Sequence, residues 1–342
     1  MFNLLQLLEH ANLAPSYYNT QPWKIAFHDN TILISADANL DLNKLDPSKS
    51  FQLISIGCFV QNVILLLKSC KRFVNIEYQT QYPNIAKIVV NMDSKQITNE
   101  HSYNKLIQLI KKRQNYRDKY LPQVVDKPIL NTEKTFFRRE INSEIKILKE
   151  KSSFKLIEKY AKKGIDLNST DKKFKNTLNK MFPSILSSSK IGIPLSALNI
   201  PTFASNIMPI ISSNQSIGKT IAKTKYPDIL TADGIIILSS KSDMKTLIQT
   251  GQDLQSILLH LSQQNLSTCL YGAPFLEKDS SDEIQKTFSL KHTPQILFTY
   301  GIRKKSTSIE QIERESIQNK IIPYLSIEKT KETHLTKNET IA

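Results

Sequence analysis

The chain has 342 residues, of which 40% are hydrophobic and 23% charged, and its formal net charge at pH 7 is +15. These proportions are close to those of globular proteins and exclude a wholly disordered chain. Only 8 residues are glycine, and their positions allow no G-x-G-x-x-G dinucleotide fingerprint. The nearest match to a phosphate-binding loop ends in Gly218-Lys219-Thr220, but Ser213 stands where its first glycine belongs. A P-loop nucleotidase is therefore not indicated.

The three cysteines, Cys58, Cys70 and Cys269, are odd in number and lack C-x-x-C spacing. Neither a disulfide framework nor a zinc site is therefore predicted, and unpaired cysteines are typical of a reducing compartment. The N-terminus lacks the basic segment of a signal peptide. No apolar run in the sequence is expected to reach the about 20 consecutive residues that a helix needs to span a membrane. These features predict a cytoplasmic protein without a metal or a membrane partner.

Positive charge is concentrated in residues 105–180, which contain 21 Lys and Arg against 9 Asp and Glu. Such a stretch can form an electrostatic surface for nucleic acid or for an acidic membrane. The alternative is a solvated helical surface, because acidic residues such as Glu133, Glu144 and Glu158 are interleaved with the basic ones. Since no nucleic-acid motif accompanies the stretch, the solvated surface is the favoured interpretation.

In chain order, apolar periodicity first predicts a helix over residues 2–12 and then a hairpin, with strands at Trp23–His28 and Thr31–Ser35 around the turn Asp29-Asn30. The later predicted helices are residues 103–114 and two surface helices, 143–163 and 170–182. The later predicted strands are Phe73–Tyr78, 84–91, Gly234–Ser239, Ser267–Tyr271 and Pro294–Tyr300. Residues 183–215 lack a clear period and are expected to form an ordered but irregular flap. The polar tail, residues 326–342, is expected to be mobile.

Two segments of the chain resemble each other. The segment from Gly57 to Leu67 matches that from Gly251 to Leu261 in a shared pattern of Gly, an aliphatic residue, Gln, three aliphatic residues and a final Leu. The apolar residues of the second copy have the i, i+3, i+4, i+7 spacing of a buried helical stripe. Each copy also precedes a predicted strand. Matching Gly and Gln at fixed offsets favour an internal duplication over a chance similarity between two core helices.

The segment from Ala14 to Trp23 has the most distinctive chemistry of the chain. A proline near each end restricts the backbone and makes the loop stiff. Between them, Ser16, Asn19 and Gln21 offer the hydrogen-bond donors and acceptors that a planar heterocycle with alternating N–H and C=O groups requires. The alternative is a loop whose polar side chains satisfy its own backbone.

The A-P-S-x-x-N-x-Q-P-W pattern of residues 14–23 resembles the flavin-binding loop of the nitroreductase superfamily. Further resemblances follow in order along the chain. The long central helix of that family is similar to Asp46-Pro47 and to Gly57 with Gln61–Leu65, and its R-R-[ST]-x-R phosphate-binding stretch is similar to Arg113-Gln114-Asn115-Tyr116-Arg117. Later segments of the family resemble Gly192–Leu195, the helix from Gly251 and Pro294–Leu297. This order is similar to the Acg-type branch, in which two halves of one chain imitate the usual homodimer. The resemblance covers about residues 5–320.

The resemblance implies an α+β, nitroreductase-like fold. In it, residues 1–100 and 101–325 form two related halves, a pseudo-dimer within one monomeric chain. FMN would bind non-covalently between the halves, and one FMN per chain is expected because the second half has no counterpart of the 14–23 loop. The expected contacts of FMN are Ser16, Asn19, Gln21, Arg113, Asn115, Arg117, Gly272 and Arg303.

Arg113 and Arg117 are the expected ligands of the FMN phosphate. Because they are four residues apart, they would face the same way in a helical turn and could donate charge-assisted hydrogen bonds. The alternative for both is an exposed basic surface. Gln114 and Asn115 replace the second arginine and the hydroxyl residue of the family pattern, which weakens the expected hold on the phosphate.

The sequence contains neither a zinc-binding histidine motif nor a serine-nucleophile motif. Catalytic chemistry is therefore expected from a cofactor rather than from a side chain. By the resemblance, the favoured function is an FMN oxidoreductase that takes hydride from NAD(P)H and reduces a nitro, quinone or similar small acceptor. The alternative is FMN storage, in which the flap covers the flavin without turnover.

Overall fold

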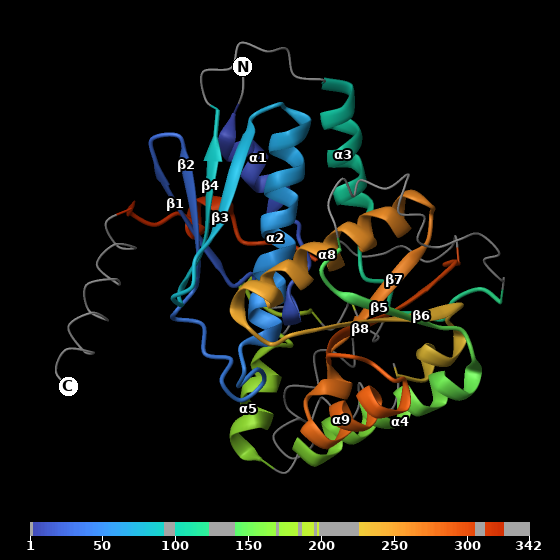
Figure 1. Cartoon of the computed structure of the whole chain (residues 1–342). Coiled ribbons are helices and arrows are strands. Elements are labelled where there is room, and N and C mark those ends of the chain that lie inside the picture. The colour runs from blue at the N-terminus through green and yellow to red at the C-terminus, as the bar shows by residue number, and fades with distance from the viewer. Residues whose placement is uncertain are drawn as a thin grey trace.

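A computed structural model describes residues 3–91, 100–122, 141–168, 171–183, 187–194, 197, 226–304 and 312–324. Within these residues, two four-stranded antiparallel sheets accompany a pair of long crossing helices (Figure 1). The fold is therefore of the α+β class, as the sequence predicted.

The first sheet has the strand order β1-β2-β4-β3, with β1 (Trp23–His28), β2 (Thr31–Ala36), β3 (Phe73–Tyr78) and β4 (Asn84–Val90). Its helices are α1 (Leu4–Ala11), α2 (Ser50–Ser69) and α3 (Glu100–Lys112). Every residue of α2 from Phe51 to Leu67 is buried, because the sheet packs on one side of this helix and the second long helix on the other. The strands predicted for this region are confirmed.

The second sheet has the strand order β5-β6-β8-β7, with β5 (Glu144–Leu148), β6 (Gly234–Ser240), β7 (Ser267–Tyr271) and β8 (Thr293–Gly301). Its helices are α4 (Lys151–Asn168), α5 (Lys172–Lys180), α8 (Met244–Gln263) and α9 (Lys278–Thr287). α8 covers one face of the sheet, and α4 with α9 the other (Figure 1). Because both faces are covered, β6 is buried along its whole length, which explains its unbroken apolar sequence.

The two long helices cross at Gly57 of α2 and Gly251 of α8. A Cβ atom on Gly57 would overlap the carbonyl oxygen of Ile248, and one on Gly251 would overlap that of Ile54. The missing side chains therefore let the two backbones touch, and each helix meets the other through the same positions.

Hydrogen bonds across the crossing are reciprocal in the same way. Gln61 Nε2 donates to Ser256 Oγ at 2.9 Å, and Gln255 Nε2 donates to Asn62 Oδ1 at 2.7 Å. The number of residues that separates Gly57 from Gly251 also separates the two glutamines and their two acceptor residues. The same number separates the first residues of α2 and α8, and their last residues. The buried polar groups of the core thus repeat the likeness between the two segments.

The helix predicted at 143–163 is wrong in its first part. Residues 144–148 form strand β5, and α4 begins only at Lys151. The apolar residues of the sequence Glu-Ile-Lys-Ile-Leu fit the period of a helix or that of a strand. The segment is a strand because it pairs with the apolar strand β6. α4 also has a buried face, which includes Phe154 and Ile157, so it is more than a surface helix.

One helix, α2, has the length and hydropathy of a membrane span, which the sequence was not expected to contain. Of its most apolar window, 89% is buried inside the protein. That burial accounts for the apolar sequence of α2 as a core helix.

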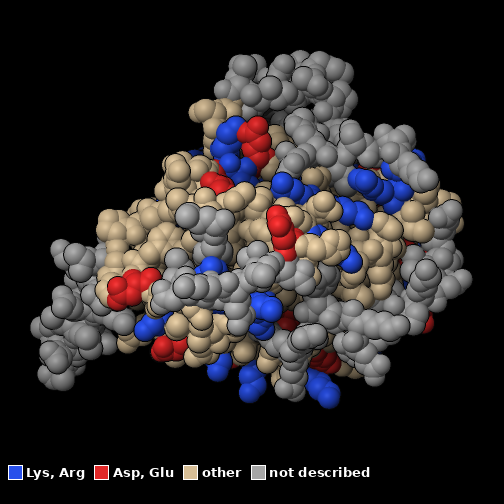
Figure 2. Space-filling model, turned by 90° about the horizontal axis from the view of Figure 1, so that it is seen from above, with Lys and Arg blue, Asp and Glu red and all other residues tan. Residues whose placement is uncertain are grey.

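The basic stretch of residues 105–180 is interrupted by opposite charge. Lys162 pairs with Glu158 at 2.8 Å, and Asp171 pairs with Lys44 at 3.2 Å. On the face shown in Figure 2, Lys and Arg side chains are likewise separated by acidic and uncharged residues. These observations agree with a solvated surface, and nucleic-acid binding stays the less favoured interpretation.

The flap predicted at 183–215 is described only at residues 183, 187–194 and 197, and the tail predicted at 326–342 lies outside the described residues. All three cysteines are buried, and none of them forms a disulfide bond.

Candidate functional site

The loop between α1 and β1 has a strained backbone. Tyr18, Asn19 and Gln21 have φ angles of 47°, 57° and 49°, values that residues other than glycine seldom adopt. Ser16 Oγ accepts a hydrogen bond from Gln21 N at 3.0 Å and so closes the loop on itself. Backbone strain of this kind persists only where the surroundings fix it, and it is concentrated at functional sites.

A cavity of about 170 Å³ lies between this loop, α2 and β7. Tyr17 and Phe51 stack in its wall with their ring centroids 4.4 Å apart. Gly272, which follows β7, keeps the wall open, since a Cβ atom there would lie 2.9 Å from the Tyr17 ring and 3.2 Å from the Phe51 ring. Further lining residues are Tyr18, Ile54, Ser55, Cys58, Leu178, Phe182, Ile193, Asp228, Leu254 and Tyr271. The larger cavity is thus mainly apolar and aromatic.

A smaller cavity of about 50 Å³ adjoins the first, and the two share Pro15, Ser16, Asn115, Arg117 and Ile193 as lining residues. The other basic side chains around the smaller cavity are Lys111, Arg113 and Arg314, and none of the described residues that line it is Asp or Glu. The gathering of four basic side chains around this cavity favours an anion as the occupant.

Two of these arginines have N–H groups without a partner. Arg113 is only 6% exposed, and its Nε and Nη1 atoms make no hydrogen bond to the described residues, nor does Nε of Arg314. Burial and the charge of Arg117 lower the pKa of Arg113 to about 10. Burial and the charges of Arg113 and Arg117 lower the pKa of Arg314 to about 9. A bound anion would both neutralise this repulsion and accept the unpaired N–H groups.

Arg113, Asn115 and Arg117 reach the cavity by a different geometry from the expected one. α3 ends at Lys112, and the backbone of Asn115 forms a bridge with Thr268 of β7. Arg113 N still donates to Leu109 O at 3.0 Å, so Arg113 completes the last turn of α3, and the chain leaves the helix before Asn115. The helical turn predicted to contain both arginines is therefore wrong, and the two side chains line one cavity although only Arg113 is at the helix end.

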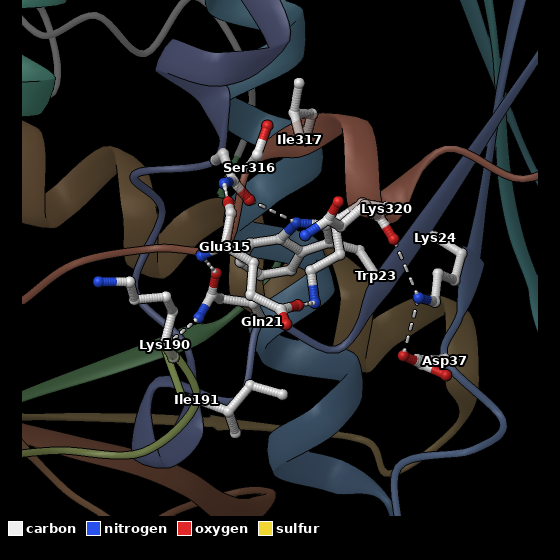
Figure 3. Close-up of polar contacts among 12 residues, drawn as sticks. Gln21, Trp23, Lys24, Asp37, Lys190, Ile191, Glu315, Ser316, Ile317 and Lys320 are labelled. Carbon is white, nitrogen blue, oxygen red and sulfur yellow. Dashed lines mark hydrogen bonds and ion pairs between the residues drawn. The ribbon is translucent and has the colours of Figure 1, made fainter. Parts of the chain in front are cut away.

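The side-chain amides of Asn19 and Gln21 are used within the protein. Gln21 Nε2 donates to the carbonyl oxygens of Asn19 at 3.0 Å and Lys190 at 2.9 Å, and its Oε1 accepts from Glu315 N at 2.8 Å (Figure 3). Asn19 Nδ2 donates to Lys190 O at 2.9 Å, and its Oδ1 accepts from Arg314. Asn19 lines the smaller cavity, whereas Gln21 lines neither. The structure thus gives Gln21 a bracing role, and its contact with a flavin stays a prediction.

Among the other residues expected from the sequence, Ser16, Asn115, Arg117 and Gly272 line the larger cavity. Arg303 is exposed and lines neither cavity. The sequence reasoning missed Arg314, because no motif surrounds it and only the folded chain brings it near Arg113. Among the described residues, no group of three His, Cys, Asp or Glu side chains is placed to hold a metal ion.

Gln21→Leu is expected to lower the free energy of unfolding by about 1–3 kcal/mol, because the buried Gln21 amide no longer bonds to Asn19 O and Glu315 N, and Lys190 O keeps only its bond from Asn19. Denaturation in urea without ligand measures this loss. An unchanged unfolding curve combined with weaker FMN binding would instead make Gln21 a ligand contact.

No family model matches the sequence, and no curated protein is significantly similar to it. Among solved structures, the chain is similar to the FMN-dependent nitroreductase NfnB from Mycobacterium smegmatis in complex with NADPH, at 12% identity and a TM-score of 0.38, over 62% of this chain and 94% of that one. It is also similar to a nitroreductase with bound FMN from Bacteroides fragilis, at 8% identity and a TM-score of 0.37, over 61% of this chain and 94% of that one. The chain is also similar to a BluB-like flavoprotein from Clostridium difficile, at 11% identity and a TM-score of 0.37, over 63% of this chain and 96% of that one. These similarities are distant, and the cavities themselves are the basis for assigning a ligand.

Proposed function

We propose that the chain binds FMN, with the ring system in the larger cavity and the phosphate in the smaller one. The observation that carries this proposal is an apolar, aromatic-lined cavity joined to a cavity lined by three arginines, of which Arg113 is buried and has unpaired N–H groups. A flat aromatic group attached to a phosphate matches both environments. The sequence resemblance of residues 14–23 and 113–117 supports the same ligand.

The residues of the site would have separate tasks. Arg113, Arg117 and Arg314 would hold the phosphate, because guanidinium N–H groups donate charge-assisted hydrogen bonds to its oxygens. Ser16 and Asn115 line both cavities, and the Oδ1 atom of Asn115 lacks a partner among the described residues. They would therefore contact the polar part of the ligand between ring and phosphate.

We infer that the bound flavin makes the chain a nitroreductase-like oxidoreductase. When bound, FMN supplies hydride transfer from NAD(P)H to a nitro, quinone or similar small acceptor. The chain itself would bind and orient the ring and exclude water, because Tyr17, Phe51, Ile54 and Leu254 give the larger cavity apolar walls. No side chain is required as a nucleophile.

One observation favours the alternative of FMN storage. Residues 187–194, the described part of the predicted flap, lie against the loop of residues 16–21, where the carbonyl oxygen of Lys190 accepts from Asn19 and Gln21. Ile193 of the same segment lines both cavities. A covering segment held this firmly would retain a flavin and also hinder a nicotinamide from reaching it.

An absorbance spectrum of the purified full chain, followed by anaerobic addition of NAD(P)H, separates these functions. We expect a yellow protein whose flavin absorbance bleaches, since an oxidoreductase must accept hydride. A flavin absorbance that persists would replace the oxidoreductase by storage. A colourless protein that cannot be loaded with FMN would overturn both.

We further propose that the two halves, residues 1–100 and 101–325, form a pseudo-dimer with one FMN per monomeric chain. The identical strand orders and the reciprocal Gly57–Gly251 crossing support this arrangement. The offset that relates the two helices places Tyr78 in the position of Gly272. Tyr78 donates from its hydroxyl to Gln252 Oε1 at 2.6 Å, so a bulky ring stands where the first site needs a glycine.

Flavin counting combined with light scattering is expected to give a monomer with one FMN. The physical reason is that the α2–α8 contact already buries the surface that two separate chains would share, and Tyr78 occupies the counterpart of the first site. Two flavins per chain, or an obligate dimer that shares its sites, would contradict the pseudo-dimer.

A further inference from the structure

A C-terminal arm, residues 312–322, runs along the first half of the chain to β1 at the edge of the first sheet (Figure 1). Its backbone N–H groups bond to the first half of the chain: Glu315 N to Gln21 Oε1 at 2.8 Å, Ile317 N to Glu9 Oε1 at 3.0 Å, and Ile322 N to Ile25 O at 2.8 Å. Within the arm, buried Lys320 pairs with Glu315 at 2.6 Å (Figure 3). The arm is therefore a braced unit that docks on α1, the 16–21 loop and β1.

The arm carries Arg314 to the smaller cavity, beside Arg113 and Arg117. Docking thus brings Arg314 toward Arg113, whose Nε and Nη1 atoms make no hydrogen bond to the described residues. Burial of its guanidinium, together with the positive charges of Arg113 and Arg117, lowers the pKa of Arg314. The charge of Arg113 therefore opposes docking of Arg314, and an anion in the cavity would offset this repulsion.

We propose that an oxoanion in the smaller cavity locks the C-terminal arm in its docked position, so that the arm opens and closes with anion occupancy. The anion is the phosphate group of a bound flavin or free inorganic phosphate, which share the same chemistry. A ligand that binds only the docked state stabilises that state in proportion to its saturation. Only the identity of the physiological anion rests on the proposed function, and the lock itself does not depend on it.

Hydrogen exchange of the full-length chain, followed in the peptide that contains residues 312–322, tests the lock. We expect inorganic phosphate at about ten times its dissociation constant to slow exchange of the arm amides about tenfold, relative to chloride at equal ionic strength. FMN is expected to slow exchange in the same way, and riboflavin, which lacks the phosphate, to leave it unchanged. Exchange that is equal in phosphate and chloride would overturn the lock.

Two variants and a matched control make the test specific. Arg314→Gln and Arg113→Gln are both expected to remove the response of the arm to phosphate, and the second leaves the sequence of the arm intact. Arg303→Gln, which changes an exposed arginine outside both cavities, is expected to keep the full response. A response that survives in both cavity variants would show that phosphate acts elsewhere and would overturn the proposal.

The outcomes for the lock and for FMN binding are separable. Protection by phosphate without any binding of FMN would uphold the lock and overturn the proposed cofactor. Binding of FMN, seen by its absorbance, without protection of the arm would uphold the cofactor and overturn the lock.

Discussion

Arg113→Met is expected to weaken FMN binding about 10- to 100-fold and to leave riboflavin binding almost unchanged. A charge-assisted hydrogen bond contributes roughly 1.5–3 kcal/mol, which corresponds to about that loss of affinity. Without ligand, the free energy of unfolding is expected to stay the same or to rise. Methionine removes a buried charge whose Nε and Nη1 atoms lack partners among the described residues. Fluorescence titration with the two flavins and urea denaturation of the ligand-free chain measure both effects.

The opposite signs of the two effects distinguish a phosphate ligand from a structural residue, because a structural arginine would lose stability and both flavins together. Arg117→Ala is expected to show the same selectivity for FMN over riboflavin. Arg303→Met is the matched control, since this arginine is exposed and lines neither cavity. Equal weakening of FMN and riboflavin in the Arg113 variant would remove the phosphate from this cavity.

Gly57→Ala is expected to lower the free energy of unfolding by about 3 kcal/mol or more, at the upper end of the effect of overpacking a core. The added methyl group would overlap the carbonyl oxygen of Ile248 and lie 2.9 Å from the Cα atom of Gly251, and backbone atoms cannot turn aside as a side chain can. The helices must therefore separate, and the larger cavity, which α2 and α8 both line, must deform with them. Urea denaturation and FMN titration measure the two consequences.

Gln263→Ala, at the exposed end of α8, is the control and is expected to change stability by less than about 0.5 kcal/mol. Gly251→Ala is expected to equal Gly57→Ala, because each glycine meets the other helix through the same positions. The double variant is expected to lose less than the sum of the two, since the first methyl group already separates the helices. Full stability of either single variant would contradict the close crossing.

The local sequence determined those parts of the fold whose periodicity has only one interpretation. The hairpin of Trp23–His28 and Thr31–Ala36 and the strands β3, β6, β7 and β8 lie where alternation or a short apolar run places them. The resemblance between the segments from Gly57 and Gly251 also predicted two similar helices, because Gly and Gln recur in both at the same offsets. The sequence could not say that each glycine lies against the other.

Tertiary structure decided the elements whose local preference is ambiguous. Residues 144–148 are a strand because β6 offers an unsatisfied edge, and the helix α3 does not continue through residue 117 because Asn115 pairs with Thr268 of β7. In both segments the spacing of the apolar or charged residues would suit a helix equally well. Hydrogen bonds to strands that are distant in the sequence determine the structure instead.

The candidate site divides in the same way. The loop from Ala14 to Trp23 and the arginines at 113 and 117 could be found from the sequence, since their residue types and spacing indicate polar recognition and an anion. The bracing role of Gln21 and the contribution of Arg314 depend on the docking of the C-terminal arm, which is far away along the chain. Motifs thus determined which chemistry the chain carries, whereas long-range contacts decided which side chains face the cavity, because burial and charge depend on what the fold brings together.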